Sequence, residues 1–252
     1  MASERIEFTG SAGTPLAARL DLPEQGTPHA YAVFAHCFTC SKDTKAPVAI
    51  GRALTQAGIG ALRFDFTGLG GSAGDFGNTT FSSNIDDLLH AARWLDEKFS
   101  APLLFIGHSL GGAAVLRAAA RHERCRAVAT IGAPFEPAHV LHHLGAALSQ
   151  IEHAGSAPVT LNGRSFNIRD DFVRDLTQHD PRAPLVALHK PLLVMHAPTD
   201  AVVPLDDARR IFEAARHPKS FIALDGDHLL SKTADGEYAG RLIAAWASRY
   251  LG

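Results

Sequence analysis

The sequence predicts one α/β domain spanning residues 1–252, built on an eight-stranded, mostly parallel sheet flanked by helices. Strand-like and helix-like segments alternate along almost the whole chain, which is typical of parallel sheets with helical crossovers. Several strand-like segments, such as Ala30–Ala35, are short apolar runs, as expected for strands buried on both faces. Hydrophobic residues make up 46% of the chain and charged residues 20%, so a sizeable core can be buried.

The sheet is expected to begin with an antiparallel hairpin and to continue with six further strands. Arg5–Thr9 and Pro15–Leu22 are separated only by Gly10–Thr14, a connection too short for a parallel crossover. The later strands are predicted at Ala30–Ala35, Ala61–Phe66, Leu103–Ile106, Ala127–Ile131, Leu192–His196 and Ser220–Leu224. Apolar spacing predicts helices at Lys45–Ala57, around 85–95, at 112–120, at Asp206–Arg216 and at Gly236–Tyr250. Gly58 is placed to end the first of these helices in a left-handed conformation.

Residues 134–190 interrupt the alternation after the sixth strand. Asn162-Gly163 lies between β-prone runs and predicts a hairpin over Pro158–Ile168, while Ala138–Ile151 and Asp170–Gln178 have helical patterns. An insert of this length between core strands usually covers a site, so we expect a small lid or cap. Its apolar stretch from Val140 to Ile151 fits ordinary core packing, with a dimer face as the alternative; we expect a monomer or a homodimer.

The pentapeptide Gly107-His108-Ser109-Leu110-Gly111 is the strongest indicator of chemistry. A short apolar strand precedes it and a helical run follows it, so the chain turns sharply from strand to helix at Ser109. Such a turn exposes the serine hydroxyl at the carboxyl edge of the sheet, and glycines are needed where side chains would collide with the tight backbone. We therefore predict that Ser109 is a nucleophile, rather than an idle serine in a small-residue turn.

A serine nucleophile needs a base and an acid that orients the base. In this class of fold the acid and the histidine follow the serine, each on a loop after a core strand. Asp200 follows Leu192–His196, and His228 follows Ser220–Leu224. We predict Ser109, Asp200 and His228 as the catalytic residues. The rival acids are weaker candidates: Asp206 and Asp207 open a helix, and Asp225 and Asp227 are too close in sequence to His228.

The oxyanion hole is predicted to use the backbone amides of Leu110, which follows the nucleophile, and of Phe38, in the loop after the third strand. Phe38 is also predicted to bind substrate through its ring; the alternative is that it only packs the loop. We predict that His108, like Phe38, is a substrate-binding residue, and its position favours support of a neighbouring loop over proton transfer.

Three further features have patterns that can mark redox, dinucleotide-binding or metal sites. Cys37 and Cys40 have the spacing of thioredoxin-like redox sites, but they have no partner pair for zinc, and we expect them to be buried as small hydrophobic residues. The glycine-rich loop after Asp65 is not followed by a helix pattern, so it does not match a dinucleotide-binding fingerprint, and Asp65 is expected to bond backbone there. His142, His143 and His153 lack paired carboxylates, so no metal site and no cofactor are expected.

These motifs together resemble the α/β-hydrolase superfamily. The resemblance is carried by His36-Cys37-Phe38, by Asp65-Phe66-Thr67-Gly68-Leu69-Gly70, by the pentapeptide and by Asp200 and His228. The superfamily usually has Gly at the position of Cys37 and Arg-Gly-His-Gly in place of Thr67–Gly70. The strings Phe34–Asp43 and Phe64–Ser72 resemble a narrower group, the hydrolase half of bifunctional proteins that also contain an OsmC-type peroxide-reducing domain. The chain ends at Gly252, so no peroxide-reducing function is expected.

The resemblance implies hydrolysis of a small-molecule carboxylic ester through an acyl-enzyme on Ser109. A thioesterase or a peptidase could use the same three residues, and a catalytically idle binding protein on this scaffold is the alternative from another class. A net charge of −2 without charged blocks excludes typical nucleic-acid and anionic-membrane binding. The absence of a signal-peptide pattern or an apolar membrane span, with only three cysteines, predicts a reducing cytoplasm.

Overall fold

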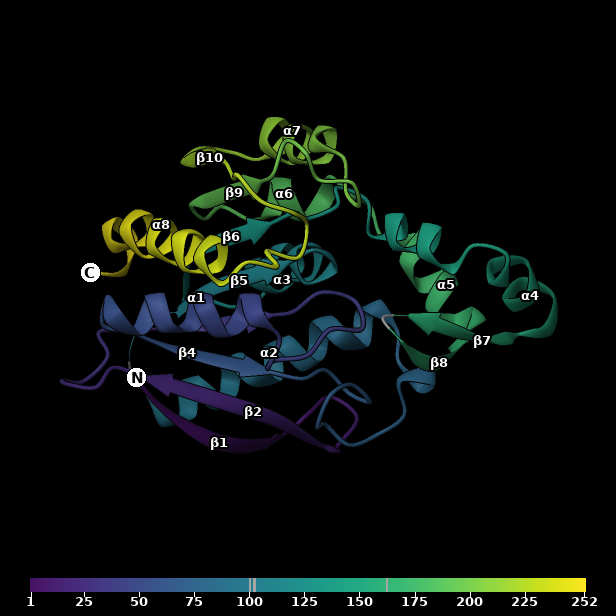
Figure 1. Ribbon diagram of the computed structural model, residues 1–252, viewed down its shortest axis with the longest axis horizontal. Helices are drawn as coiled ribbons and strands as arrows, with labels where there is room; N and C mark the ends of the chain where they lie inside the picture. The colour runs from purple at the N-terminus through teal and green to yellow at the C-terminus, as the bar shows by residue number, and fades with distance from the viewer. Residues whose placement is uncertain (100, 102, 162) are drawn as a thin grey trace.

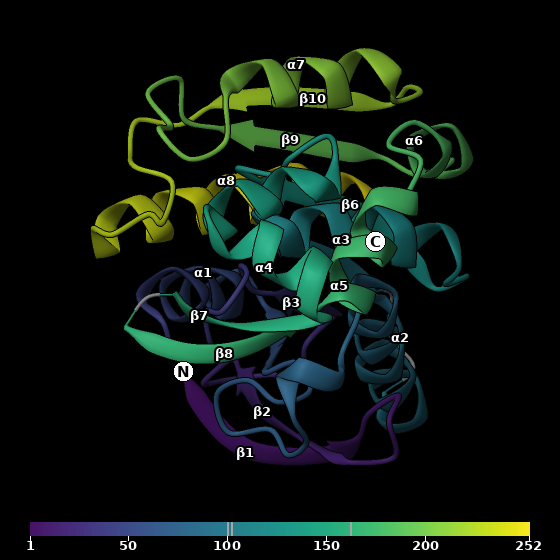
Figure 2. The same cartoon turned by 90° about the vertical axis from the view of Figure 1, so that its right-hand side faces the viewer.

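A computed structural model describes residues 1–99, 101, 103–161 and 163–252. Its main sheet has eight strands in the order β1-β2-β4-β3-β5-β6-β9-β10 (Figures 1 and 2). The first two strands form the expected antiparallel hairpin, β2 pairs antiparallel with β4, and the remaining pairs are parallel. The strands are β1 Ala2–Thr9, β2 Pro15–Leu22, β3 Ala30–Ala35, β4 Ile59–Phe64, β5 Leu103–His108, β6 Cys125–Ile131, β9 Leu192–His196 and β10 Lys219–Ala223.

Helices cover both faces of this sheet. On one face α1 (Lys45–Gln56) packs beside α8 (Thr233–Leu251), and both contact an alanine- and isoleucine-rich layer of the central strands. The other face is covered by α2 (Phe81–Lys98), α3 (Leu110–Ala120) and α7 (Leu205–Ala214). Burial of the central strands on both sides explains why their sequences lack polar alternation: every residue of β3 and of β5 is buried.

Most predicted elements of the main sheet and its covering helices are confirmed, and the differences there lie at their ends. Gly58 has a φ of +78° directly after α1, as predicted for a left-handed helix stop. β4 ends at Phe64, two residues earlier than predicted, so Asp65 and Phe66 belong to the following loop. β5 continues to His108, because its ladder with β6 reaches Ile131.

The insert between β6 and β9 forms a separate small body beside the carboxyl edge of the sheet (Figure 1). Its hairpin, β7 (Ser156–Leu161) and β8 (Arg164–Arg169), is confirmed as a two-stranded sheet; Asn162 of the predicted turn lies outside the described residues. The helix predicted over Ala138–Ile151 is corrected to two pieces, η2 (Pro137–Leu144) and α4 (Ala147–Ala154). Gly145 lies between them with a φ of +51°, which a regular helix cannot accommodate.

Two further helices complete the insert. The helix predicted at Asp170–Gln178 is confirmed as α5, and α6 (Ala183–Ala187) was not predicted. A short 3-10 turn, η1 (Phe76–Asn78), lies outside the insert and contacts β8.

Within the described residues no helix combines the length and the apolar character that crossing a membrane would require.

Candidate active site

Ser109 lies at a sharp turn between β5 and α3 whose backbone is fixed by close packing. Its φ and ψ are 54° and −125°, a conformation that non-glycine residues rarely adopt. A Cβ atom on Gly107 would lie 2.3 Å from the Gly111 carbonyl oxygen, and one on Gly111 would lie 2.3 Å from that of Ala35. The Ser109 amide donates to the Ile131 carbonyl at 2.9 Å, which ties the turn to β6. Both glycines are therefore required by space, as the sequence predicted.

The structure brings Ser109, His228 and Asp200 into one hydrogen-bonded chain. His228 Nδ1 lies 2.7 Å from Asp200 Oδ2, and His228 Nε2 lies 3.0 Å from Ser109 Oγ. Because the carboxylate can only accept, Nδ1 carries the ring proton and Nε2 is left to accept the serine proton. The side chains of Asp200 and His228 are 1% and 7% exposed, so water competes little with these bonds. A serine paired in this way can be activated as a nucleophile.

Asp200 is held as an ionised acceptor. Its Oδ1 accepts from the amides of Val202 and Val203 at 2.8 and 2.9 Å. Burial alone would raise the pKa of Asp200, but the hydrogen bonds from His228, Val203 and Val202 outweigh burial, and the pKa is lowered. The group opposite His228 therefore stays charged and can stabilise a protonated imidazole.

Three of the four rival acids lie in other interactions. Asp206 pairs with Arg209 at the start of α7, and Asp207 accepts from the Phe135 amide at 3.1 Å. Asp227 accepts from the Ser231 amide at 2.9 Å. His228 Nδ1 donates its hydrogen bond to Asp200, the residue that the strand order favoured.

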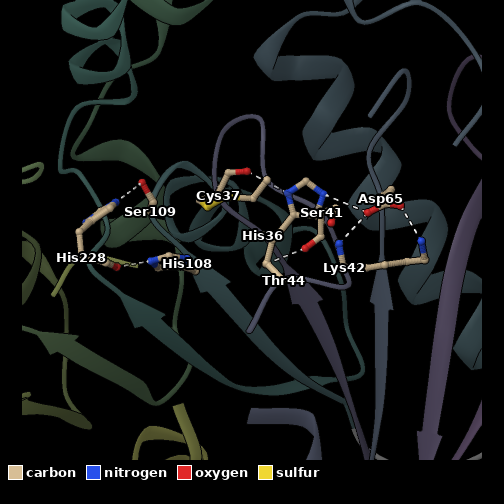
Figure 3. Close-up of a disulfide and its surroundings, with 10 residues drawn as sticks. His36, Cys37, Ser41, Lys42, Thr44, Asp65, His108, Ser109 and His228 are labelled. Atoms are coloured by element: carbon tan, nitrogen blue, oxygen red, sulfur yellow. Dashed lines mark hydrogen bonds and ion pairs between the residues drawn. A yellow bond between two sulfur atoms is a disulfide. The ribbon is translucent and has the colours of Figure 1, made fainter. Parts of the chain in front are cut away.

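The loop after β3 carries a disulfide between Cys37 and Cys40, visible beside Ser109 in Figure 3. The expectation that these cysteines are buried as free small hydrophobic residues is therefore wrong. The two residues close a tight turn, in which the Cys40 amide donates to the Cys37 carbonyl at 3.1 Å. Thr39 in this turn has a φ of +60°, which is unfavourable for a β-branched residue. The pattern of spacing could not separate paired from unpaired sulfurs.

A buried ion pair anchors the same loop at its far end. Asp65 is fully buried, and it accepts from the Lys42 amide at 2.6 Å, from Lys42 Nζ at 2.7 Å and from the Gly71 amide at 2.8 Å (Figure 3). The expectation that Asp65 bonds backbone is thus supported, and its pairing with Lys42 was not predicted. The chain enters the loop at His36, whose Nδ1 donates to the Cys37 carbonyl at 2.8 Å. Both ends of the loop are therefore fixed.

Ser109 opens into a cavity of about 160 Å³ between the sheet edge and the insert. The lining is mostly apolar and includes both predicted oxyanion residues, Phe38 and Leu110. The insert contributes Pro134, His139, Val140, His143 and Leu161 to it. The Phe38 ring also stacks on Phe172 of α5, with ring centroids 5.6 Å apart. Among the described backbone hydrogen bonds outside regular helices and strands, neither the Phe38 amide nor the Leu110 amide is a donor.

His108 does not take the substrate-contact position that was predicted for it. Its side chain is buried and is not part of the cavity lining, as far as the described residues define it. Its Nε2 donates to the His228 carbonyl oxygen at 2.7 Å, so it supports the loop of the base. Burial, together with the neighbouring His228, lowers the pKa of His108 to about 4 and keeps it neutral.

Two other histidines support the loop of the acid, and sequence reasoning missed both. His196 Nε2 lies 2.8 Å from the Val203 carbonyl, and His139 Nε2, from the insert, lies 2.8 Å from the Val202 carbonyl. The same two valine residues donate their amides to Asp200. His196 could have been found from the sequence, because it is a polar residue at the end of an apolar strand, four residues before the acid. His139 has no such signal, because its partner is far away in sequence.

No group of three or more metal-binding side chains is found in the part of the chain that the structure describes. His139 and His142 pack edge to face, with centroids 4.9 Å apart, while His143 lines the cavity. Burial, with the neighbouring histidines, lowers the pKa of His143. His139 and His143 thus form part of the cavity wall.

Comparisons with known proteins identify the family and the fold of the chain. A family model described as serine aminopeptidase, S33, matches residues 26–182. The solved structure of an esterase domain from Rhodothermus marinus is 47% identical, covers 100% of both chains and has a TM-score of 0.82. Est1E from Butyrivibrio proteoclasticus, solved with ferulic acid, has a TM-score of 0.84 over 98% of this chain and 99% of that one, at 20% identity. The predicted α/β-hydrolase fold is confirmed.

A relative characterised as a thioesterase is also similar to the chain. The mouse mitochondrial palmitoyl-protein thioesterase ABHD10 is 26% identical over 196 residues, which are 75% of this chain. The chain spans 65% of the length of that relative.

Proposed function

The chain belongs to the serine aminopeptidase S33 family of α/β-hydrolases, and from this premise we propose that it hydrolyses carboxylic esters through an acyl-enzyme on Ser109. The observation that carries the proposal is the chain of hydrogen bonds from Asp200 through His228 to Ser109, which opens into an apolar cavity. The esterase domain of Rhodothermus marinus supports an ester substrate over the other acyl compounds that such a site can cleave.

In the proposed reaction His228 accepts the proton of Ser109 as Oγ attacks the ester carbonyl carbon. Asp200 stabilises the imidazolium that results. The amides of Phe38 and Leu110 donate to the developing oxyanion, and the amino end of α3 adds a favourable dipole. His228 then protonates the leaving alcohol. In the second half, His228 deprotonates a water molecule that attacks the acyl-enzyme, and Ser109 regains its proton when the acid leaves.

The cavity favours a neutral, apolar acyl group. Its described lining contains no Asp, Glu, Lys or Arg side chain. An aminopeptidase would have to hold the ammonium group of a peptide, and a buried ammonium without a carboxylate partner is strongly disfavoured. We therefore place peptides last among the possible substrates. Thioesters are the second candidate, because the mouse relative is a thioesterase.

We also propose that residues 134–190 act as a small lid over the site. The insert supplies one wall of the cavity, and Phe172 packs on the Phe38 ring. Residues of the insert are thus placed to select the acyl group while the residues at the sheet edge perform the chemistry.

The proposal is tested with Ser109→Ala. We expect hydrolysis of short p-nitrophenyl esters to fall at least about 10⁴-fold, because the nucleophile is lost, and labelling by a fluorophosphonate to disappear. Ser248→Ala is the matched control, because Ser248 is exposed on α8 and its hydroxyl donates to the Ala245 carbonyl of the same helix. Wild-type ester turnover by the Ser109 variant would overturn the mechanism.

A panel of esters, thioesters and amides of matched acyl length identifies the substrate class. Ester rates above thioester and amide rates are expected. Thioester rates above ester rates would favour the second candidate, and an unreactive Ser109 in the wild-type protein would favour an idle binding scaffold.

Three finer expectations remain predictions. The narrower resemblance to hydrolases joined to OsmC-type domains is not addressed by the family model or by the relatives named above. A cytoplasmic location is to be tested by cell fractionation. The Cys37–Cys40 disulfide makes this test important, because disulfides are rare in reducing compartments. A monomer or homodimer is to be distinguished by light scattering.

A further inference from the structure

We propose that the Cys37–Cys40 disulfide is a thiol-exchange site inside the catalytic cavity, where a low-molecular-weight thiol reduces it and thereby slows acylation of Ser109. The effect on rate rests on the proposed function, since it assigns Phe38 as an oxyanion donor. The exchange site itself rests only on where the two sulfurs lie.

The disulfide faces the same cavity as the nucleophile. Cys37 and Cys40 line the cavity together with Ser109 and His228 (Figure 3). Cys37 is only 6% exposed, while Cys40 is partly exposed. A cavity of about 160 Å³ admits a small molecule and not a folded protein. Because Cys40 is the more exposed residue of the pair, we take its sulfur as the one attacked and a small thiolate as the attacking species.

The disulfide constrains the backbone that carries Phe38. The segment is anchored before the turn by the His36 contact to the Cys37 carbonyl, and after it by Lys42, which bonds Asp65 through its amide. Between these anchors the disulfide and a hydrogen bond from the Cys40 amide to the Cys37 carbonyl cross-link the turn. Thr39 is held at a φ of +60°, which a β-branched residue adopts only under constraint. Removing the disulfide allows this turn to relax and Phe38 to move with it.

The exchange is chemically balanced with a thiol as the reductant. A thiolate attacks Cys40 Sγ, which forms a mixed disulfide on Cys40 and releases Cys37 as a thiolate. A second small thiolate attacks the small-molecule sulfur of the mixed disulfide. The two small molecules leave as their own disulfide, and Cys40 is released and becomes a thiol. Two small thiols are oxidised and one protein disulfide is reduced. The reverse reaction with a small-molecule disulfide restores the cross-link.

A purely stabilising role fits this disulfide poorly. Disulfides stabilise a fold mainly by closing long loops in the unfolded chain, and only two residues separate these cysteines. Its main consequence is therefore local, at Phe38, rather than global. Reduction should change acylation much more than it changes the melting temperature.

The experiment compares oxidised protein with protein treated with reduced glutathione and then freed of the thiol by gel filtration, since thiols attack p-nitrophenyl esters directly. Thiols are counted in the native protein, and acylation is followed both as ester hydrolysis and as the rate of fluorophosphonate labelling. We expect two additional thiols and an acylation rate lowered about tenfold or more, as for a displaced oxyanion donor. Treatment with oxidised glutathione should restore the rate.

Two variants separate the effect from general damage. Cys37→Ser/Cys40→Ser should acylate slowly and no longer respond to glutathione. Cys125→Ala should respond as the wild type does, because Cys125 is a free, buried cysteine outside the cavity, and burial raises its pKa to about 12. No release of thiols in the folded protein, or release with acylation unchanged, would overturn the proposal. If the oxidised protein reacted with neither ester nor fluorophosphonate, the proposed function would be wrong, while the thiol count would still decide whether the exchange site exists.

Discussion

The two segments that flank Ser109 are held in place by different means. The turn after β5 is fixed by its own backbone, because Gly107 and Gly111 leave no room for a side chain. The loop after β3 is fixed by cross-links between side chains, namely the disulfide and the Asp65–Lys42 ion pair. The conformation of the turn after β5 is determined by a few neighbouring residues. The conformation of the loop after β3 depends on distant partners and on the redox state of its cysteines.

The largest effect is expected from Gly111→Ala. The added Cβ would lie 2.3 Å from the Ala35 carbonyl oxygen and 2.5 Å from that of His36, so the start of α3 must move away from the end of β3. We expect unfolding free energy to fall by about 4 kcal/mol or more, beyond ordinary overpacking, or no soluble protein at all. Gly71→Ala is the control, because the nearest atom to its added Cβ is the Ala17 Cβ at 3.3 Å. Equal urea midpoints for the two variants would contradict the account of the turn.

A smaller effect is expected from Asp65→Asn, which removes the charge opposite Lys42. Asp65 is fully buried and the Lys42 side chain is 10% exposed, so the lysine would lose its buried partner. Breaking a buried pair in this way costs about 3 kcal/mol, and ester turnover should fall with it because the loop carries Phe38. Asp43→Asn is the matched control: Asp43 contacts the same Lys42 Nζ at 3.1 Å but is 54% exposed, and about 1 kcal/mol or less is expected. Both are measured by urea unfolding, and equal losses would show that burial does not matter here.

The smallest effect concerns the pH dependence of stability at the turn. The pKa of His108 is lowered from 6.5 to about 4, mainly by burial, so the unfolded chain binds more protons between these values. The stability contributed by neutral His108 is therefore complete above the unfolded pKa and is lost as the pH falls toward the folded one. Between about pH 7 and about pH 4.5, the loss of this contribution lowers the free energy of unfolding by about 2 kcal/mol. His108→Gln keeps a donor for the His228 carbonyl without titrating, so its unfolding free energy should fall less over this interval; parallel curves would contradict the assignment.

The same difference explains what could be predicted from the sequence. Ser109 could be predicted because its motif is local. Asp200 and His228 could be predicted because each follows a core strand in the expected order. The pairing of Asp65 with Lys42 spans 23 residues and left no local pattern. Cys37 and Cys40 were misinterpreted, because a spacing of three does not report whether two sulfurs meet. The helix break at Gly145 was missed, because apolar residues keep a helical period across it.

The bond from His139 to the Val202 carbonyl ties the insert to the residues that hold Asp200. A chimaera in which residues 134–190 were replaced by the corresponding segment of a relative would therefore alter more than the shape of the cavity. It would also remove a support of the acid, and the loss of rate would be mistaken for poor substrate fit. Engineering the specificity of this protein by segment exchange should keep a donor at position 139.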